Sequence, residues 1–236
     1  MNKYTDMQKS QYDAEGKNWN PTDGRDYVIG SLDSQNAWPE YENLFTGMTT
    51  GDKVMLDFGC GPGRSIILYG DRFLQVDGAD ISAILLDKAR MWMEYNNYTK
   101  PCNLYETDGV SLSEVPSDVY DVVMSTICLQ HICVHEIRYS IMQDIFRVLK
   151  PGGWFTAEMS YGTEYPHAVE YYDNFYDAIR TNSGMDTRVT DPNQLKGDLE
   201  KIGFKNFSYI LTDPQPWEGT IAEKVIFFRA QKPDSV

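Results

Sequence analysis

The chain has 236 residues, of which 42% are hydrophobic and 24% charged, and a net charge of −14 at pH 7. It lacks both the ~20 apolar residues of a membrane span and the apolar core of a secretory signal. Its four cysteines have no framework spacing, so we expect a cytoplasmic protein that contacts no membrane. The acidic balance counts against a nucleic-acid partner, because proteins that bind phosphate backbones rely on basic patches.

Residues 1–50 are polar and rich in turn formers, with weak helical signals at 27–32 and 41–44. Beyond them, short apolar runs alternate with segments of helical period. The runs that predict buried strands are 53–58, 73–80, 102–106, 119–125, 154–159, 206–211 and 224–229. The segments that predict helices are 84–92, capped by Ser82 or Asp80, then 135–149, stopped by Lys150-Pro151-Gly152-Gly153, and 192–202.

Strands that alternate with helices predict a doubly wound α/β fold, in which a mainly parallel sheet has helices on both faces. The last two strands follow each other without a helix, so we expect an antiparallel hairpin at one edge. We predict that residues 51–236 form this domain. Residues 1–50 would be an N-terminal helical extension or lid, and residues 160–190 an insertion that covers the substrate.

A glycine-rich loop, DFGCGPG at residues 57–63, follows the first predicted strand. Glycines there permit positive φ angles and a close approach of the backbone to a ligand, although a tight turn without a ligand is the alternative. Arg64 stands at the third glycine position of a dinucleotide fingerprint, so the spacing does not match one. Asp57 beside the loop would repel a pyrophosphate. We therefore expect a ligand that is zwitterionic or cationic at this point.

Two further acids follow the next two predicted strands. Asp80 can accept both hydroxyls of a ribose, and Asp108 can accept a hydrogen bond from an adenine amino group. For each acid alone, a helix cap or a solvated turn is the commoner explanation. Ligands of open parallel sheets bind at the carboxyl ends of the strands, where these acids and Asp57 converge. Together they predict one binding site at that edge of the sheet.

These motifs resemble those of the small-molecule branch of the class I S-adenosylmethionine-dependent methyltransferases. The similar stretches are LDFGCGPGR, GADIS, TDG, VYDVVMSTICLQHI, RVLKPGGWF and LEKIGFKNF. The resemblance implies a seven-stranded sheet of order 3-2-1-4-5-7-6, with S-adenosylmethionine as cofactor and S-adenosylhomocysteine as product. It implies these cofactor contacts: Asp57, Gly59, Cys60, Gly61, Asp80, Ile81, Asp108, Gly109, Val110 and Ser125.

The resemblance also implies that a methyl group moves by in-line displacement to an oxygen or nitrogen atom of a small-molecule acceptor. A hydroxyl acceptor must lose its proton as it attacks, which favours a base of near-neutral pKa. His131 follows the fourth predicted strand, at the mouth where the methyl group would emerge. We predict that it is the base or orients the substrate; a histidine that caps a helix or bonds a loop is the alternative. His135 is interpreted as a helix-start residue.

The acceptor is expected to lie against parts outside the core fold. Tyr12 and Trp19 in the extension, and Tyr161 and Tyr165 in the insertion, are candidate substrate contacts because aromatic rings can enclose a flat or cationic molecule. The aromatic residues between 172 and 179 recur at helical spacing. An amphipathic core face is the alternative interpretation for them.

The stretch CLQHICVHE, residues 128–136, contains two cysteines and two histidines, which raises a zinc site as an alternative. On one continuous helix, Cys128, His131 and His135 would share a face. The predicted strand ends near residue 125 and the helical period starts only near 135. The chain therefore changes direction inside the stretch, and we expect no metal.

Other functions stay open as alternatives. A nucleic-acid or protein methyltransferase is one; the net charge disfavours nucleic acid, and so does the stretch 125–128, Ser-Thr-Ile-Cys, where amino-methylating enzymes commonly carry Asn/Asp-Pro-Pro-Tyr/Phe. A non-catalytic S-adenosylmethionine-binding module is the second. A dehydrogenase is the third, disfavoured by the glycine spacing. The oligomeric state is open between monomer and homodimer.

Overall fold

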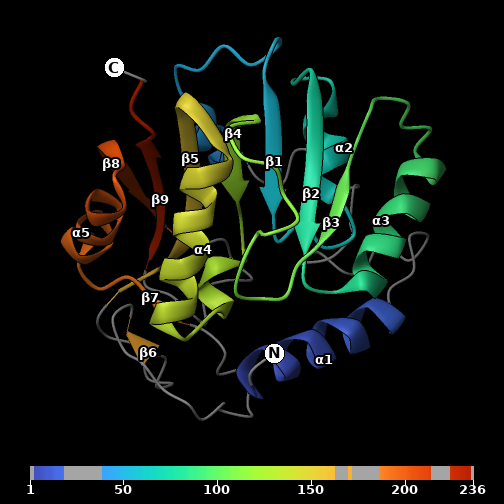
Figure 1. Ribbon diagram of the computed structural model, residues 1–236, viewed down its shortest axis with the longest axis horizontal. Coiled ribbons are helices and arrows are strands. Elements are labelled where there is room, and N and C mark those ends of the chain that lie inside the picture. Colours follow the sequence, from blue (N-terminus) through green and yellow to red (C-terminus); the bar gives the residue numbers. More distant parts are fainter. Residues whose placement is uncertain (1–2, 19–38, 163–169, 172–186, 214–223, 235–236) are drawn as a thin grey trace.

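The computed structural model describes residues 3–18, 39–162, 170–171, 187–213 and 224–234 (Figure 1). Seven strands form one sheet in the order β3-β2-β1-β4-β5-β9-β8. They are β1 (Val54–Phe58), β2 (Gln75–Asp80), β3 (Leu104–Glu106), β4 (Tyr120–Ser125), β5 (Leu149–Tyr161), β8 (Lys205–Thr212) and β9 (Lys224–Gln231). The first five pair in parallel, whereas β9 is antiparallel to both β5 and β8. The predicted order and the predicted edge hairpin are confirmed, with β8 and β9 as sixth and seventh strands.

Two short strands not expected from the sequence form a second, parallel sheet. They are β6 (Glu170–Tyr171) and β7 (Thr187–Arg188), and Val189 continues from β7 to a bridge with Tyr161 at the end of β5. Most of the predicted insertion 160–190, including Tyr165, lies outside the described residues, and so do Trp19 and the helical signal at 27–32.

Helices cover both faces of the large sheet, as predicted. They are α2 (Arg64–Gly70), α3 (Ala83–Tyr95), α4 (His135–Val148) and α5 (Pro192–Ile202), with the 3₁₀ helices η1 (Pro39–Phe45) and η2 (Leu129–His131). Ile141 of α4 and Leu199 of α5 belong to one apolar core, and Ile66 of α2 and Phe45 of η1 belong to the other. Among the described residues, no helix is long and apolar enough to cross a membrane.

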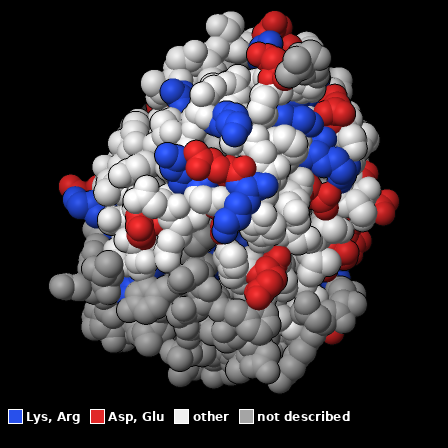
Figure 2. Space-filling view, turned by 60° about the vertical axis from the view of Figure 1, so that its left-hand side comes forward, with Lys and Arg blue, Asp and Glu red and all other residues white. Residues whose placement is uncertain are grey.

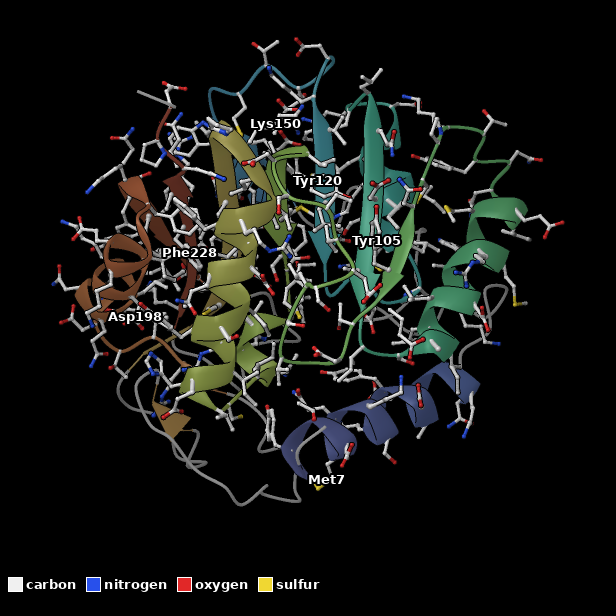
Figure 3. The ribbon with its side chains drawn as sticks, in the orientation of Figure 1. Met7, Tyr105, Tyr120, Lys150, Asp198 and Phe228 are labelled. Atoms are coloured by element: carbon white, nitrogen blue, oxygen red, sulfur yellow. The ribbon has the colours of Figure 1, made fainter. Side chains whose placement is uncertain are left out.

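A buried polar network joins β2 to the residue before β3 and to the start of β4. Asp77 on β2 is 1% exposed and accepts hydrogen bonds from the Tyr120 hydroxyl at 2.8 Å and from the Asn103 backbone N–H at 2.8 Å. Figure 3 labels Tyr120 on β4 and Tyr105 on β3, the strands on either side of β1 and β2. Because the buried carboxylate has these partners, the network fixes the strands whose far ends form the site.

The helix α1 (Lys3–Asn18) belongs to the predicted N-terminal helical extension, although no local pattern marked these residues. It lies across the end of the sheet toward which the parallel strands point (Figure 1). Its inward face repeats every fourth residue, at Tyr4, Gln8, Tyr12 and Gly16. Tyr4 and Gln8 donate hydrogen bonds to a backbone carbonyl, and Gly16 has no side chain. The helix therefore has no continuous apolar stripe. Met7 projects from the side away from the sheet (Figure 3).

Candidate active site

A cavity lies where β1, β2 and β4 end, beneath α1. Its walls come from α1, from the loop after β1, from the ends of β2 and β3, and from the segment after β4. Nine residues predicted from the sequence line it: Tyr12, Asp57, Gly59, Cys60, Gly61, Asp80, Ile81, Gly109 and His131. Four other predicted residues are described by the structure but do not line this cavity: Asp108, Val110, Ser125 and Tyr161.

The glycine loop adopts the backbone conformations that glycine permits. Gly59, Gly61 and Gly63 have φ angles of +78°, +50° and +81°, a region that side chains disfavour. A Cβ atom at Gly59 would lie 2.3 Å from the Cys128 sulfur, whereas one at Gly61 would meet nothing within 4 Å. The loop therefore packs tightly against the segment after β4 at Gly59 and leaves its backbone accessible at Gly61.

Asp57 is the penultimate residue of β1, lines the cavity and is 2% exposed. Burial raises the pKa of its carboxyl from 3.8 to about 7; the nearby Arg64 guanidinium lowers it, the Asp80 carboxylate raises it, and a hydrogen bond with Ser65 lowers it. A buried carboxyl that ionises near neutral pH gains most from a cationic ligand, because such a ligand replaces the water that burial removed.

Asp80 ends β2 and joins the glycine loop to the start of α3. Its Oδ2 accepts the Gly61 N–H at 2.8 Å and its Oδ1 accepts the Ser82 N–H at 2.9 Å. Burial raises the pKa of this carboxyl to about 6, while those N–H groups oppose the shift. Each oxygen has a second lone pair, so the carboxylate can still accept hydroxyl groups from a ligand. Ser82 caps α3 as predicted, accepting the Leu85 N–H.

Asp108 is exposed and its carboxylate bonds its own turn. Oδ1 accepts the N–H groups of Val110 at 2.9 Å and Ser111 at 2.7 Å, and Oδ2 accepts the Ser111 hydroxyl at 3.0 Å. Its neighbours Thr107 and Gly109 line the cavity instead. The contact between Asp108 and adenine stays a prediction. The hydrogen bonds that the carboxylate makes here are those of the alternative, a solvated turn.

The segment after β4 forms the wall beside the glycine loop. The Ser125 hydroxyl is buried and donates to the Phe58 carbonyl at 3.0 Å, which ties β4 to β1. Ile127 has a φ of +51°, which is rare for a β-branched residue, and its N–H donates to Glu158 Oε1 of β5 at 2.8 Å. Ile127 was not predicted as a lining residue, because nothing in the local sequence signals a left-handed residue there.

His131 ends η2 and lines the cavity. Its backbone carbonyl accepts hydrogen bonds from the Tyr4 hydroxyl at 2.8 Å and from Gln8 Nε2 at 2.6 Å, both on α1. His135 begins α4, which confirms its interpretation as a helix-start residue, and its Nε2 lies 2.6 Å from Asp198 Oδ2 of α5. The 3₁₀ turn at His131 and the start of α4 at His135 interrupt the face that a continuous helix would share with Cys128.

The helix α1 is bonded to both sides of the cavity. Besides its contacts with His131, Lys9 Nζ donates to the Ile81 carbonyl at 2.8 Å and to Glu106 Oε1 at 2.6 Å. The Ser82 hydroxyl donates to Asp13 Oδ1 at 2.5 Å. Gln8 and Glu15 line the cavity, although the sequence analysis assigned neither to the site. The spacing of four residues from Tyr4 through Gly16 is the one signal that could have found Gln8, and Glu15 lies outside it.

Comparison with known proteins gives consistent results. Residues 55–153 match the family described as "Methyltransferase domain". The chain is 26% identical over 178 residues to trans-aconitate 2-methyltransferase of Paracidovorax citrulli, an alignment that covers 72% of this chain and 63% of that protein. The chain spans less than two thirds of the length of the curated relatives it matches.

Two solved structures share the fold over almost the whole chain. Phosphoethanolamine N-methyltransferase 2 of Haemonchus contortus, in complex with S-adenosyl-L-methionine, is 20% identical with a TM-score of 0.68, covering 99% of this chain and 61% of that one. The [4+2]-cyclase SpnF is 15% identical with a TM-score of 0.69, covering 98% and 97%. At these identities the likeness concerns the fold, which hosts more than one chemistry.

Proposed function

We propose that this chain is a class I S-adenosylmethionine-dependent methyltransferase that methylates an oxygen or nitrogen atom of a small-molecule acceptor. The observation that carries the proposal is the position of α1. Because this helix lies across the ends of the strands and bonds both walls of the cavity, the acceptor has to fit within a covered space. Such a space suits a small molecule better than a duplex or an extended chain.

The residues at the cavity fit S-adenosylmethionine. We propose that Asp57 pairs with its ammonium group while Gly59, Cys60 and Gly61 lie along its methionine part. Asp80 would accept the ribose hydroxyls and Ile81 would pack on the adenine. The edge of the adenine would be bounded by Asp108, Gly109 and Val110, and Ser125 would lie beside the methionyl group. When bound, the cofactor supplies a methyl group already activated on a sulfonium, suited to in-line displacement.

The buried carboxyls support this assignment. Asp57 and Asp80 both have raised pKa values because burial disfavours their charge. A ligand that brings an ammonium group to one and hydroxyl donors to the other relieves that cost. A dinucleotide would instead bring a pyrophosphate to the loop beside Asp57, so the charge at this point favours the sulfonium cofactor.

His131 is the proposed base or substrate-orienting residue. Tyr4 and Gln8 hold its backbone carbonyl, so the backbone that carries the ring has a fixed position at the cavity wall. Since transfer depends mainly on alignment of the nucleophile, worth ~7–11 kcal/mol in well-oriented reactions, such anchoring is what the chemistry needs. The ring can accept the proton of a hydroxyl acceptor or hold an amine in line.

The covering parts are proposed from their position. Residues 1–50 would act as the lid, because α1 spans the cavity and Tyr12 lines it. Tyr161 ends β5, at the start of the insertion 160–190, and bridges to Val189 near the end of that insertion. We propose Tyr161, Trp19 and Tyr165 as acceptor contacts. Four free thiols among the described residues are consistent with a cytoplasmic location.

The test is production of S-adenosylhomocysteine with a panel of acceptors. The panel contains carboxylates such as trans-aconitate and amines such as phosphoethanolamine, because these compounds appear in the names of proteins similar to this chain. We expect turnover with a member of one chemical class and none with DNA, RNA or protein substrates. Turnover with nucleic acid or protein alone would overturn the acceptor class. Absence of S-adenosylmethionine binding at millimolar concentration would overturn the whole proposal, including the non-catalytic alternative.

A further inference from the structure

Strand β8 ends the large sheet and leaves apolar side chains exposed. It pairs with β9 on one side and is the last strand in the sheet order. Tyr209, Ile210 and Leu211 are 47%, 45% and 37% exposed. They are consecutive residues of one strand, and the other large exposed hydrophobic side chains of the described residues are Leu74 and the pair Met91 and Tyr95 on α3. An edge of this kind offers unpaired backbone groups and apolar surface together.

The apolar cores on both faces of the sheet continue onto this edge. Tyr209 lies opposite Phe228, which belongs to the core under α4 and α5. Ile210 lies opposite Phe227, which belongs to the core on the other face. Since neighbouring residues of a strand point to opposite faces, the exposed side chains extend both cores to the last strand. A further strand beyond β8 would cover both at once.

The regular part of β8 lacks the devices that usually protect an edge. Charged side chains, prolines and bulges discourage edge pairing. The irregularity of β8 lies at its start, between Lys205 and Ser208, where Asn206 has a φ of +55°. The remaining residues 208–212, Ser-Tyr-Ile-Leu-Thr, carry neither a charge nor a proline.

We propose that β8 pairs antiparallel with β8 of a second copy of this chain, about a two-fold axis at Ile210. In that register Ile210 lies opposite its own copy, Tyr209 opposite Leu211, and Ser208 opposite Thr212. Apolar side chains then meet apolar ones and hydroxyls meet hydroxyls, a self-complementarity that a two-fold interface requires. A register centred on Tyr209 would place Ser208 against Ile210 and lose this match.

Charge does not oppose this contact locally, although each copy carries −14. Figure 2 brings the side of α5, β8 and β9 forward and shows Lys and Arg interspersed with Asp and Glu. Arg229 on β9 donates to the Ser208 hydroxyl at 3.2 Å, so this cation is bonded within its own copy. A partner face of a single charge sign would find no complementary surface here, whereas the same mixed-sign face of a second copy would meet no concentrated like charge, which favours a second copy.

The first experiment measures self-association of the full chain by analytical ultracentrifugation. At about 100 µM, above the micromolar range of weaker interfaces, we expect a dimer. Ile210→Lys should weaken the dimer at least tenfold, because two like charges then lie directly opposite each other. Met91→Lys on α3, a site 49% exposed, is the matched control and should leave the dimer unchanged. Both variants need an unchanged circular dichroism spectrum.

The second experiment tests the register by cysteine cross-linking. Directly opposed residues have Cβ atoms ~4.5–5.5 Å apart, so Ile210→Cys should give a covalent dimer under mild oxidation. Ser208→Cys should not, because the two copies of residue 208 are offset by four residues, ~14 Å along the strands. The wild-type chain controls for its four native cysteines.

Several outcomes would overturn the proposal: a monomer at the highest concentration, a dimer that Ile210→Lys leaves intact, or cross-linking through Ser208→Cys and not Ile210→Cys. Capture of a different protein by β8 without self-association would likewise overturn it. None of these measurements depends on methyl transfer, so the proposed function and this interface stand or fall separately.

Discussion

Lowering the pH should weaken cofactor binding through Asp57. The pKa of this buried carboxyl is raised from 3.8 to about 7, so in the ligand-free protein about a tenth of it is ionised at pH 6 and most of it at pH 8. An ammonium group pairs with the ionised form. We therefore expect the affinity for S-adenosylhomocysteine, which keeps the ammonium group, to fall about tenfold between pH 8 and pH 6.

Isothermal titration calorimetry measures both the affinity and the protons released. At pH 7, close to the pKa of Asp57, binding should release about half a proton, seen as a dependence of the measured enthalpy on the buffer. Asp57→Asn is the control, since an amide of the same shape cannot ionise. It should bind weakly and change by no more than about twofold between pH 6 and pH 8, the change that Asp80, with its pKa of about 6, would itself contribute. A wild-type affinity that changes less than twofold, or an Asp57→Asn variant with the wild-type slope, would refute the reasoning.

The same carboxyl should make the ligand-free fold less stable as the pH rises. The folded-state pKa lies above the unfolded value, so the protonated form stabilises the fold fully below pH 3.8, and this stability is lost as the pH approaches 7. At about 1.4 kcal/mol per pH unit, the interval amounts to about 4 kcal/mol as an upper value. Urea denaturation across this range should show the slope in the wild type and a smaller one in Asp57→Asn.

Three further predictions concern the walls of the cavity. Gly59→Ala should abolish cofactor binding and lower the unfolding free energy more than Gly61→Ala. A Cβ atom at residue 59 would lie 2.3 Å from the Cys128 sulfur, whereas one at residue 61 would meet nothing within 4 Å. Calorimetry and urea denaturation of both variants measure the two effects. Tyr4→Phe should cost about 1–3 kcal/mol in urea denaturation, since it removes a buried hydroxyl that bonds two backbone groups. His131→Ala should lower turnover at least tenfold and leave cofactor affinity nearly unchanged; unchanged turnover would remove His131 from the mechanism.

Local sequence determined the elements of the large sheet and most of its helices. The helix α5 begins and ends where it was predicted, because Asp191 caps it, Pro192 opens it and Gly203 follows its end. Apolar runs marked the strands, and the loop after β1 and the acid ending β2 marked the cavity, since the carboxyl ends of parallel strands meet at one edge. Nothing beyond neighbouring residues was needed for these inferences.

Tertiary contacts decided the rest of the site. The helix α1 carries no apolar stripe, and its position depends on Tyr4 and Gln8 binding the carbonyl of His131, more than a hundred residues away. Ile127 adopts its left-handed conformation beside Glu158 of another strand. The Asp108 carboxylate bonds its own turn instead of lining the cavity. The sequence by itself determined which strands end at the site, because period and capping are local. Only the tertiary structure decided which side chains enclose it, because those hydrogen bonds join segments that no local pattern connects.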